Sequence, residues 1–209
     1  MNRTRLILRG TALVLAGVII FLAGLRVASR RSARVDLPPP DATADYGAVE
    51  DFSFVDQSSR TVTLDTLKGK DWVADFVFTR CAGPCPIVSK HMSDVASEFK
   101  DKANLMFVSF SVDPDFDTPA VLAKYAKNYD ADPNRWLFLS GQKAKVYSLI
   151  HNSFHLAAEP LPSQNPGEID IMHSLYFCLV NGEGRIIGVY DTNDLAAMDR
   201  LKAALKKLP

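Results

Sequence analysis

The sequence offers few of the features that settle a protein's class at first sight. It has only three cysteines in 209 residues, too few to establish an oxidising compartment by their number alone. It shows no internal repeat and no low-complexity block apart from one proline-rich stretch, which excludes repeat and fibrous architectures. With 47% apolar residues the chain can still bury one good core, so we expect one globular domain.

The chain also has no net charge, and this balance hides an uneven distribution. All seven charged residues within residues 1–34 are arginines, which leaves 17 basic and 24 acidic residues in residues 35–209. The larger part therefore carries a net charge of about −7. An acidic globular part disfavours nucleic acid and anionic lipid surfaces as partners.

An uncharged apolar run near the start predicts a single membrane anchor within residues 1–34. The span 6–27 reaches membrane-spanning length if Arg9 and Arg26 extend to the headgroups. A cleaved signal peptide is the alternative, but no small-x-small site follows the run and Arg26 stands where one would be needed. Arginines flank both ends, so charge does not set the orientation. A chain that combines an export-type segment with cysteines is expected to place its C-terminal domain on the extracytoplasmic, periplasmic side of the membrane.

Residues 35–50 read as a tether between this anchor and a domain at 51–209. Three consecutive prolines favour an extended polyproline II conformation, and the small and acidic residues around them cannot build a core. At about 3 Å per residue, such a tether could hold the domain some tens of ångströms from a bilayer.

The domain alternates between strand-like and helix-like patterns. Two short strands around the turn DQSSR predict an opening hairpin. Pro86 and Thr118 suit helix starts, and Asp194 suits the cap of a last helix. The expected strands are 52–55, 61–64, 72–78, 105–112, 136–139, 171–180 and 185–190; the expected helices are 86–100, 119–129, 142–154 and 195–208, with a proline-rich loop up to residue 167.

Cys81 and Cys85 lie in the run FTRCAGPCP, between an apolar strand-like stretch and an amphipathic helix. Gly83 and Pro84 force a tight turn that brings the two sulfurs together. The turn is therefore a disulfide, a metal clip, or both in different redox states. A helix N-terminus stabilises a thiolate, and Arg80 is a candidate for a neighbouring cation that does the same. Two reduced cysteines with only a structural role are the alternative.

His173 lies far downstream in a second apolar stretch and completes a soft set of donors. Two thiolates and one imidazole suit Cu(I), which prefers sulfur and accepts low coordination, whereas Zn(II) normally takes a fourth ligand. These residue types therefore favour copper.

The order of elements resembles the thioredoxin fold, and four motifs narrow the resemblance. FTRCAGPCP, SFSVDPDFDTP, WLFLSG and IMHSLYFCLVNGEGRI together resemble the Sco/SenC family of membrane-anchored copper-binding assembly proteins, over about residues 50–208. The resemblance implies an α/β thioredoxin-like fold with an N-terminal β-hairpin, preceded by a single transmembrane helix. It also implies copper binding by Cys81, Cys85 and His173, and service to the copper site of cytochrome c oxidase.

The sequence departs from that family pattern at two positions. Arg80 stands where a histidine often precedes the first cysteine, and Met172 stands where an aspartate often precedes the ligand histidine. On a single strand, Met172 and His173 would point to opposite faces, so Met172 is expected to pack rather than to bind the metal. The lost aspartate affects partner docking or histidine orientation more than copper binding.

Asp75 keeps a second function open, that of a thiol–disulfide oxidoreductase acting on partner cysteines. It is a carboxylate inside the apolar strand WVADFVF, six residues before Cys81. The arrangement ADF…CAGPC is similar to that of thioredoxins, in which a buried aspartate at this offset moves a proton to and from the second cysteine. A strand-edge carboxylate that reaches solvent or a backbone partner is the alternative. Only the copper function requires His173.

For three further groups of residues we expect a structural role rather than a metal site. Asp113, Asp115 and Asp117 alternate like calcium ligands, but Thr118 and Pro119 replace the glycine turn, so a loop and a helix cap are expected. The two other groups are the pair His151 and His155, which could grip a metal if both lie on one helix, and Cys178, which is expected in the core.

Overall fold

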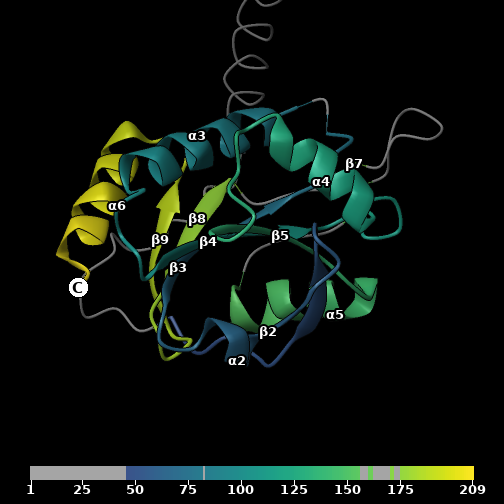
Figure 1. The fold of residues 1–209 in the computed structure, drawn as a ribbon, viewed down its shortest axis with the longest axis horizontal. Helices are drawn as coiled ribbons and strands as arrows, with labels where there is room; N and C mark the ends of the chain where they lie inside the picture. Colours follow the sequence, from purple (N-terminus) through teal and green to yellow (C-terminus); the bar gives the residue numbers. More distant parts are fainter. Residues whose placement is uncertain (1–45, 82, 156–159, 162–169, 172–174) are drawn as a thin grey trace, which may run out of the picture. The chain divides into compact units, whose positions relative to one another are not determined.

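The computed structural model describes residues 46–81, 83–155, 160–161, 170–171 and 175–209. They form a seven-stranded mixed sheet in the order β2-β1-β5-β4-β3-β8-β9, and β6 and β7 pair separately (Figure 1). The strands are β1 (Ser53–Asp56), β2 (Thr61–Thr63), β3 (Asp71–Val77), β4 (Leu105–Ser111), β5 (Trp136–Ser140), β6 (Pro160–Leu161), β7 (Asp170–Ile171), β8 (Tyr176–Val180) and β9 (Ile186–Asp191). The helices are α2 (Leu64–Leu67), α3 (Cys85–Glu98), α4 (Pro119–Lys127), α5 (Lys143–Ser148), the π-helix η1 (Leu149–Ser153) and α6 (Leu195–Lys207).

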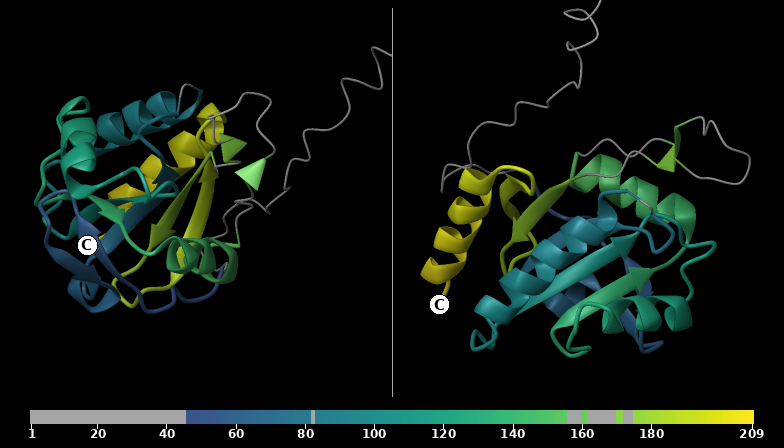
Figure 2. Two further views of the ribbon diagram at one scale, coloured as in Figure 1. Left: turned by 90° about the vertical axis from the view of Figure 1, so that its right-hand side faces the viewer. Right: turned by 90° about the horizontal axis from the view of Figure 1, so that it is seen from above.

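The three central strands are parallel and buried, which explains why they read as continuous apolar runs. Helices α3 and α4 lie on one side of the sheet, and α2 and α5 lie on the other (Figures 1 and 2). Strands β3 and β4 are in register, with Val77 opposite Ser111. The loops that follow these two strands therefore begin side by side, and this edge of the sheet carries the candidate site.

Two core layers hold the sheet between its helices. On one face, α3, α4 and α6 pack their apolar sides onto strand residues such as Val73, Phe107 and Phe177. On the other face an aromatic cluster centres on Phe110, with Phe76 stacked at 5.4 Å between ring centroids and Phe154 at 6.1 Å. Burying such rings removes large apolar areas from water and fixes the strand register.

The helix starts expected from the sequence are confirmed. Thr118 caps α4 by accepting a hydrogen bond from the Val121 backbone N–H at 3.4 Å, and Asp194 caps α6 by accepting from Ala196 N–H at 2.9 Å. Helix α3 begins one residue earlier than expected, at Cys85. The opening hairpin is confirmed as well, since β1 and β2 pair antiparallel.

Two expectations about single long elements are wrong. The predicted strand 171–180 is two strands, because β7 pairs with β6 whereas β8 joins the large sheet beside β3. The predicted helix 142–154 changes to π-helix after Ser148. A π-turn adds one residue to the turn, so the side chains that follow no longer keep the 3.6-residue spacing. The loop expected before residue 167 also contains β6.

The described part of the chain begins within the predicted tether. Ala48 forms a bridge with Arg185, and Val49 N–H donates to the Gly184 carbonyl at 2.8 Å, so ordered packing starts before residue 51. Among the described residues, no helix is both long and apolar enough to cross a membrane. The predicted anchor, residues 1–34, lies outside the described residues.

Candidate metal centre

The two thiols lie where β3 gives way to α3. After Phe78 the chain turns, and the Cys81 backbone N–H donates to the Phe78 carbonyl at 3.3 Å. Pro84 occupies the N-cap position of α3 and Cys85 is the first helical residue. The sequence therefore places one sulfur in the turn and the other at the N-terminus of a 14-residue helix. The helix dipole alone would favour a thiolate there, but contact with Cys81 and burial outweigh it at Cys85.

The two sulfurs differ in their access to solvent. Cys81 is half-buried and Cys85 is 0% exposed, and neither forms a disulfide. The side chains are in hydrogen-bond contact, and this contact together with burial raises the pKa of Cys85 far above its usual range. The Cys85 thiol therefore holds its proton firmly, and an incoming ligand meets the half-buried Cys81 first.

Asp75 lies within the sheet and is fully buried. It sits on the central strand β3, between β4 and β8, so the alternative of a strand-edge carboxylate reaching solvent is wrong. Neither carboxylate oxygen has a hydrogen-bond partner within the described part of the chain. The hydroxyl of its register neighbour Ser109 accepts the Trp136 indole N–H at 2.9 Å, and its interaction with Asp75 lowers the pKa of that carboxyl, against the larger effect of burial. Burial raises the pKa of Asp75 to about 7.

The Asp75 carboxyl is close enough to act on the cysteines. Beyond the contact with Cys81 and burial, a charge on Asp75 raises the pKa of Cys85 further, and it acts in the same direction on Cys178, whose pKa is raised mainly by burial. Cys178 lies opposite Ala74 in the β3–β8 pair and is 0% exposed, so its expected place in the core is confirmed.

Residues of the β4–α4 loop brace the thiol turn, a role that the sequence had not suggested for them. Asp117, fully buried, accepts hydrogen bonds from the Thr79 backbone N–H at 3.2 Å and the Thr79 hydroxyl at 2.5 Å. The Ser111 hydroxyl donates to the same carboxylate at 2.6 Å. Burial raises the pKa of Asp117. This loop is thus fastened to the residue two positions before Cys81.

Arg80 makes a second connection between the same two loops. Its Nε and Nη2 atoms donate to Oδ2 of Asp113 at 3.0 and 2.5 Å, and its guanidinium carbon lies 4.3 Å from the centre of the Phe116 ring. The sequence suggested Arg80 as a cation beside the Cys81 thiolate. In the structure its guanidinium group binds Asp113 and Phe116. The signal that could have found this pairing is topological, since neighbouring parallel strands bring their following loops together.

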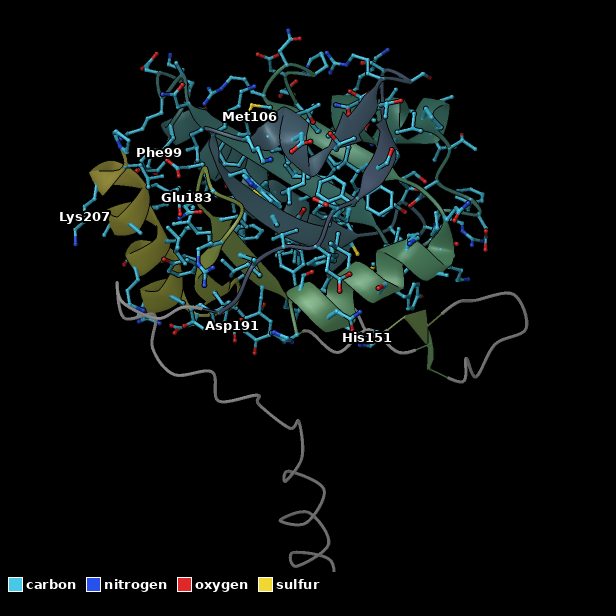
Figure 3. The ribbon with its side chains drawn as sticks, turned by 90° about the horizontal axis from the view of Figure 1, so that it is seen from below. Phe99, Met106, His151, Glu183, Asp191 and Lys207 are labelled. Carbon is cyan, nitrogen blue, oxygen red and sulfur yellow. The ribbon has the colours of Figure 1, made fainter. Side chains whose placement is uncertain are left out.

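The other predicted site residues are not brought to the thiols by the described structure. His173 and Met172 lie outside the described residues. His151 is exposed on η1, as Figure 3 shows, and His155 follows with a φ of 50°. The π-turn between them breaks the i, i+4 spacing that their pairing assumed. Among the described residues, no group of three or more His, Cys, Asp or Glu side chains could hold a metal ion.

A family model described as SCO1/SenC matches residues 40–208, which include both loops of the site. The chain belongs to the SCO1/SenC family. The "SCO1 protein homolog" of Bacillus subtilis (strain 168) is 34% identical over 145 residues, covering 68% of this chain and 73% of the relative. The family resemblance drawn from the motifs is thereby confirmed.

Solved structures of Sco proteins share the fold. Bradyrhizobium japonicum ScoI with copper bound superposes with a TM-score of 0.64 at 28% identity, covering 75% of this chain and 99% of that one. BsSco, described as a member of the Sco family of cytochrome c oxidase assembly proteins with a disulfide switch, has a TM-score of 0.66 at 30% identity and covers 82% and 96%. The thioredoxin-like α/β Sco fold is thereby confirmed.

Proposed function

We propose that this SCO1/SenC protein is a copper chaperone that binds one copper ion through Cys81, Cys85 and His173 and passes it to the copper-site subunit of a cytochrome c oxidase. The observation that carries the proposal is the thiol pair itself, two contacting reduced sulfurs of which only Cys81 is open to solvent. A half-open site suits cargo that must be handed on, because a partner's ligand can attack the metal at the exposed sulfur.

The donor chemistry fits copper. The two thiols already lie in contact, so Cu(I) would find both sulfurs without a rearrangement of the turn. His173 supplies the third donor in this proposal, because the described residues contain no third His, Cys, Asp or Glu suitable for a metal. Copper is also the ion bound in the related Bradyrhizobium japonicum ScoI structure.

The proposed location rests on the sequence. Residues 1–34 would form a single-pass membrane anchor with basic flanks, and residues 35–50 a proline-rich tether whose last residues already pair with the domain. Residues 51–209 would be the thioredoxin-like domain on the periplasmic side. Such a placement would bring the domain close to a membrane-bound oxidase.

Copper titration of the full chain in detergent tests the proposal. We expect about one Cu(I) per reduced chain, because the three donors form one site. Oxidation of Cys81 and Cys85 to a disulfide is expected to abolish binding, since a disulfide offers no thiolate. Undiminished stoichiometric binding by a Cys81→Ser, Cys85→Ser double variant would show that the copper site lies elsewhere.

A second candidate function, reduction of disulfides in a partner, is favoured by Asp75. Its buried carboxyl acts electrostatically on Cys85 and has a pKa of about 7, which suits a group that takes a proton from a thiol at neutral pH. Related BsSco is described as having a disulfide switch.

Thiol–disulfide exchange by Asp75→Asn tests this second function. The amide cannot accept the Cys85 proton, so exchange near pH 7 is expected to slow by about tenfold while the copper affinity stays nearly unchanged. Equal exchange rates for variant and parent between about pH 6 and about pH 8 would reduce Asp75 to a structural residue.

A further inference from the structure

The residues just before Cys81 are held by buried carboxylates of another loop. Thr79 donates hydrogen bonds to Asp117, and Arg80 donates to Asp113, which is only 1% exposed. The 113–117 segment is itself a tight turn, because Phe116 and Asp117 N–H groups both donate to the Asp113 carbonyl, at 3.0 and 2.9 Å. The thiol turn therefore rests on a preformed support.

Arg80 is the part of this support that lies nearest the exposed sulfur in sequence. Two of its nitrogens converge on one carboxylate oxygen, and its guanidinium group stacks on Phe116, which is 43% exposed. Charge-assisted hydrogen bonds to a buried carboxylate are stronger than neutral ones, and the stacked ring shields one side of them. Movement of Cys81 away from Cys85 would have to break these contacts or bend the chain immediately after Arg80.

We propose that Arg80 is a positioning residue that latches the thiol turn to the β4–α4 loop and thereby slows the opening of Cys81 away from Cys85. We call the contact of Arg80 with Asp113 and Phe116 the Arg80 latch. The inference deepens the proposed copper function and rests on it: the latch would set how fast a bound copper ion is released, in addition to how fast Cys81 reacts when no metal is bound.

The direction of one rate separates this role from a simple effect of charge. If Arg80 acted by stabilising the Cys81 thiolate, its removal would lower the thiolate fraction and slow alkylation. If it acts as a latch, its removal frees the turn and speeds alkylation. The rate at which iodoacetamide alkylates Cys81 in the reduced, metal-free full chain therefore distinguishes the two.

Arg60 provides a matched control in the β1–β2 hairpin. Its Nε atom donates at 2.7 Å to Oδ2 of Asp56, a residue that is 0% exposed, so an exposed arginine again pairs with a buried aspartate. Arg60→Leu removes the ion pair of Asp56, whose Oδ1 still accepts the Ser58 and Arg60 backbone N–H groups at 2.8 Å each, whereas Arg80→Leu removes both side-chain donors of Asp113. Both variants should lower stability, Arg80→Leu by the larger amount. Only Arg80→Leu should change the chemistry of Cys81.

We expect Arg80→Leu to raise the Cys81 alkylation rate about tenfold and Arg80→Lys, which keeps the charge but not the two-nitrogen contact, to give an intermediate rise. A double variant, Arg80→Leu with Asp113→Asn, should regain stability in urea while its alkylation stays fast. An unchanged or slower rate in Arg80→Leu, or a normal rate in the double variant, would overturn the latch.

Release of Cu(I) to a competing chelator completes the test on the loaded protein. The parent chain should release copper about tenfold more slowly than Arg80→Leu and at the same rate as Arg60→Leu. If the parent binds no copper at all, the proposed function fails, and the metal-free alkylation rates still decide whether the latch exists. If copper binds and all three chains release it equally fast, the latch fails and the chaperone proposal stands.

Discussion

At the scale of single residues, Asp75 is the carboxyl whose burial should cost the fold stability at neutral pH. Its carboxyl is fully buried without a hydrogen-bond partner among the described residues, and burial raises its pKa from 3.8 to about 7. A carboxyl with a raised folded pKa favours the folded state most when it is protonated. The folded chain is therefore most stable below about pH 4, where Asp75 is protonated. Its free energy of unfolding falls as the pH rises to about 7, because the buried carboxyl must ionise.

Asp75→Asn should accordingly become more stable than the parent as the pH rises. One pKa unit corresponds to about 1.4 kcal/mol, so the advantage of the variant in free energy of unfolding should grow by about 4 kcal/mol between about pH 4 and about pH 8. Urea unfolding of the reduced, metal-free chains at both pH values measures it. The exposed Asp199, replaced by Asn, is the control. If the stability advantage of Asp75→Asn does not vary with pH, the pKa of Asp75 is the same in the folded and the unfolded chain, and the raised pKa is wrong.

At the scale of elements, the sequence predicted what depends on local pattern and missed what depends on which elements meet. Strand β3 and helix α3 could be predicted because an apolar run, a tight turn and a proline in the first helical turn are all local signals. The break between β7 and β8 could not be predicted, since an apolar stretch does not reveal that its two ends pair with different strands.

The support beneath the thiol turn was missed for the same reason. The residues Asp113 and Asp117 look like loop and cap residues when the DPDFDTP segment is considered alone. Their role depends on β3 and β4 being parallel neighbours in register, which places Thr79 and Arg80 opposite that segment. The thiol pair was predictable because both cysteines belong to one turn, whereas the position of His173 depends on a distant segment and remains a prediction.

At the scale of the whole molecule, the two candidate functions make different demands on the chain. Both need the Cys81 and Cys85 sulfurs at the end of β3, but only copper delivery needs a donor from the distant segment that contains His173. Thiol–disulfide exchange uses two sulfurs and a proton acceptor, which lie in β3, in the turn that follows it and at the first residue of α3.

His173→Ala and Cys81→Ser should therefore be compared in a host that lacks its own copy of this gene, with oxidase activity measured at limiting and at added copper. If the chain delivers copper, both variants lose oxidase assembly at limiting copper. Added copper should then partly restore His173→Ala, which keeps two sulfurs, but not Cys81→Ser, which keeps one. Immunoblots for equal amounts of each variant exclude loss of the protein as the cause. Full assembly with His173→Ala at limiting copper, alongside failure of Cys81→Ser, would contradict copper delivery through this site. The histidine would then be dispensable to a reaction that still needs the Cys81 sulfur, and thiol–disulfide exchange would remain as the function.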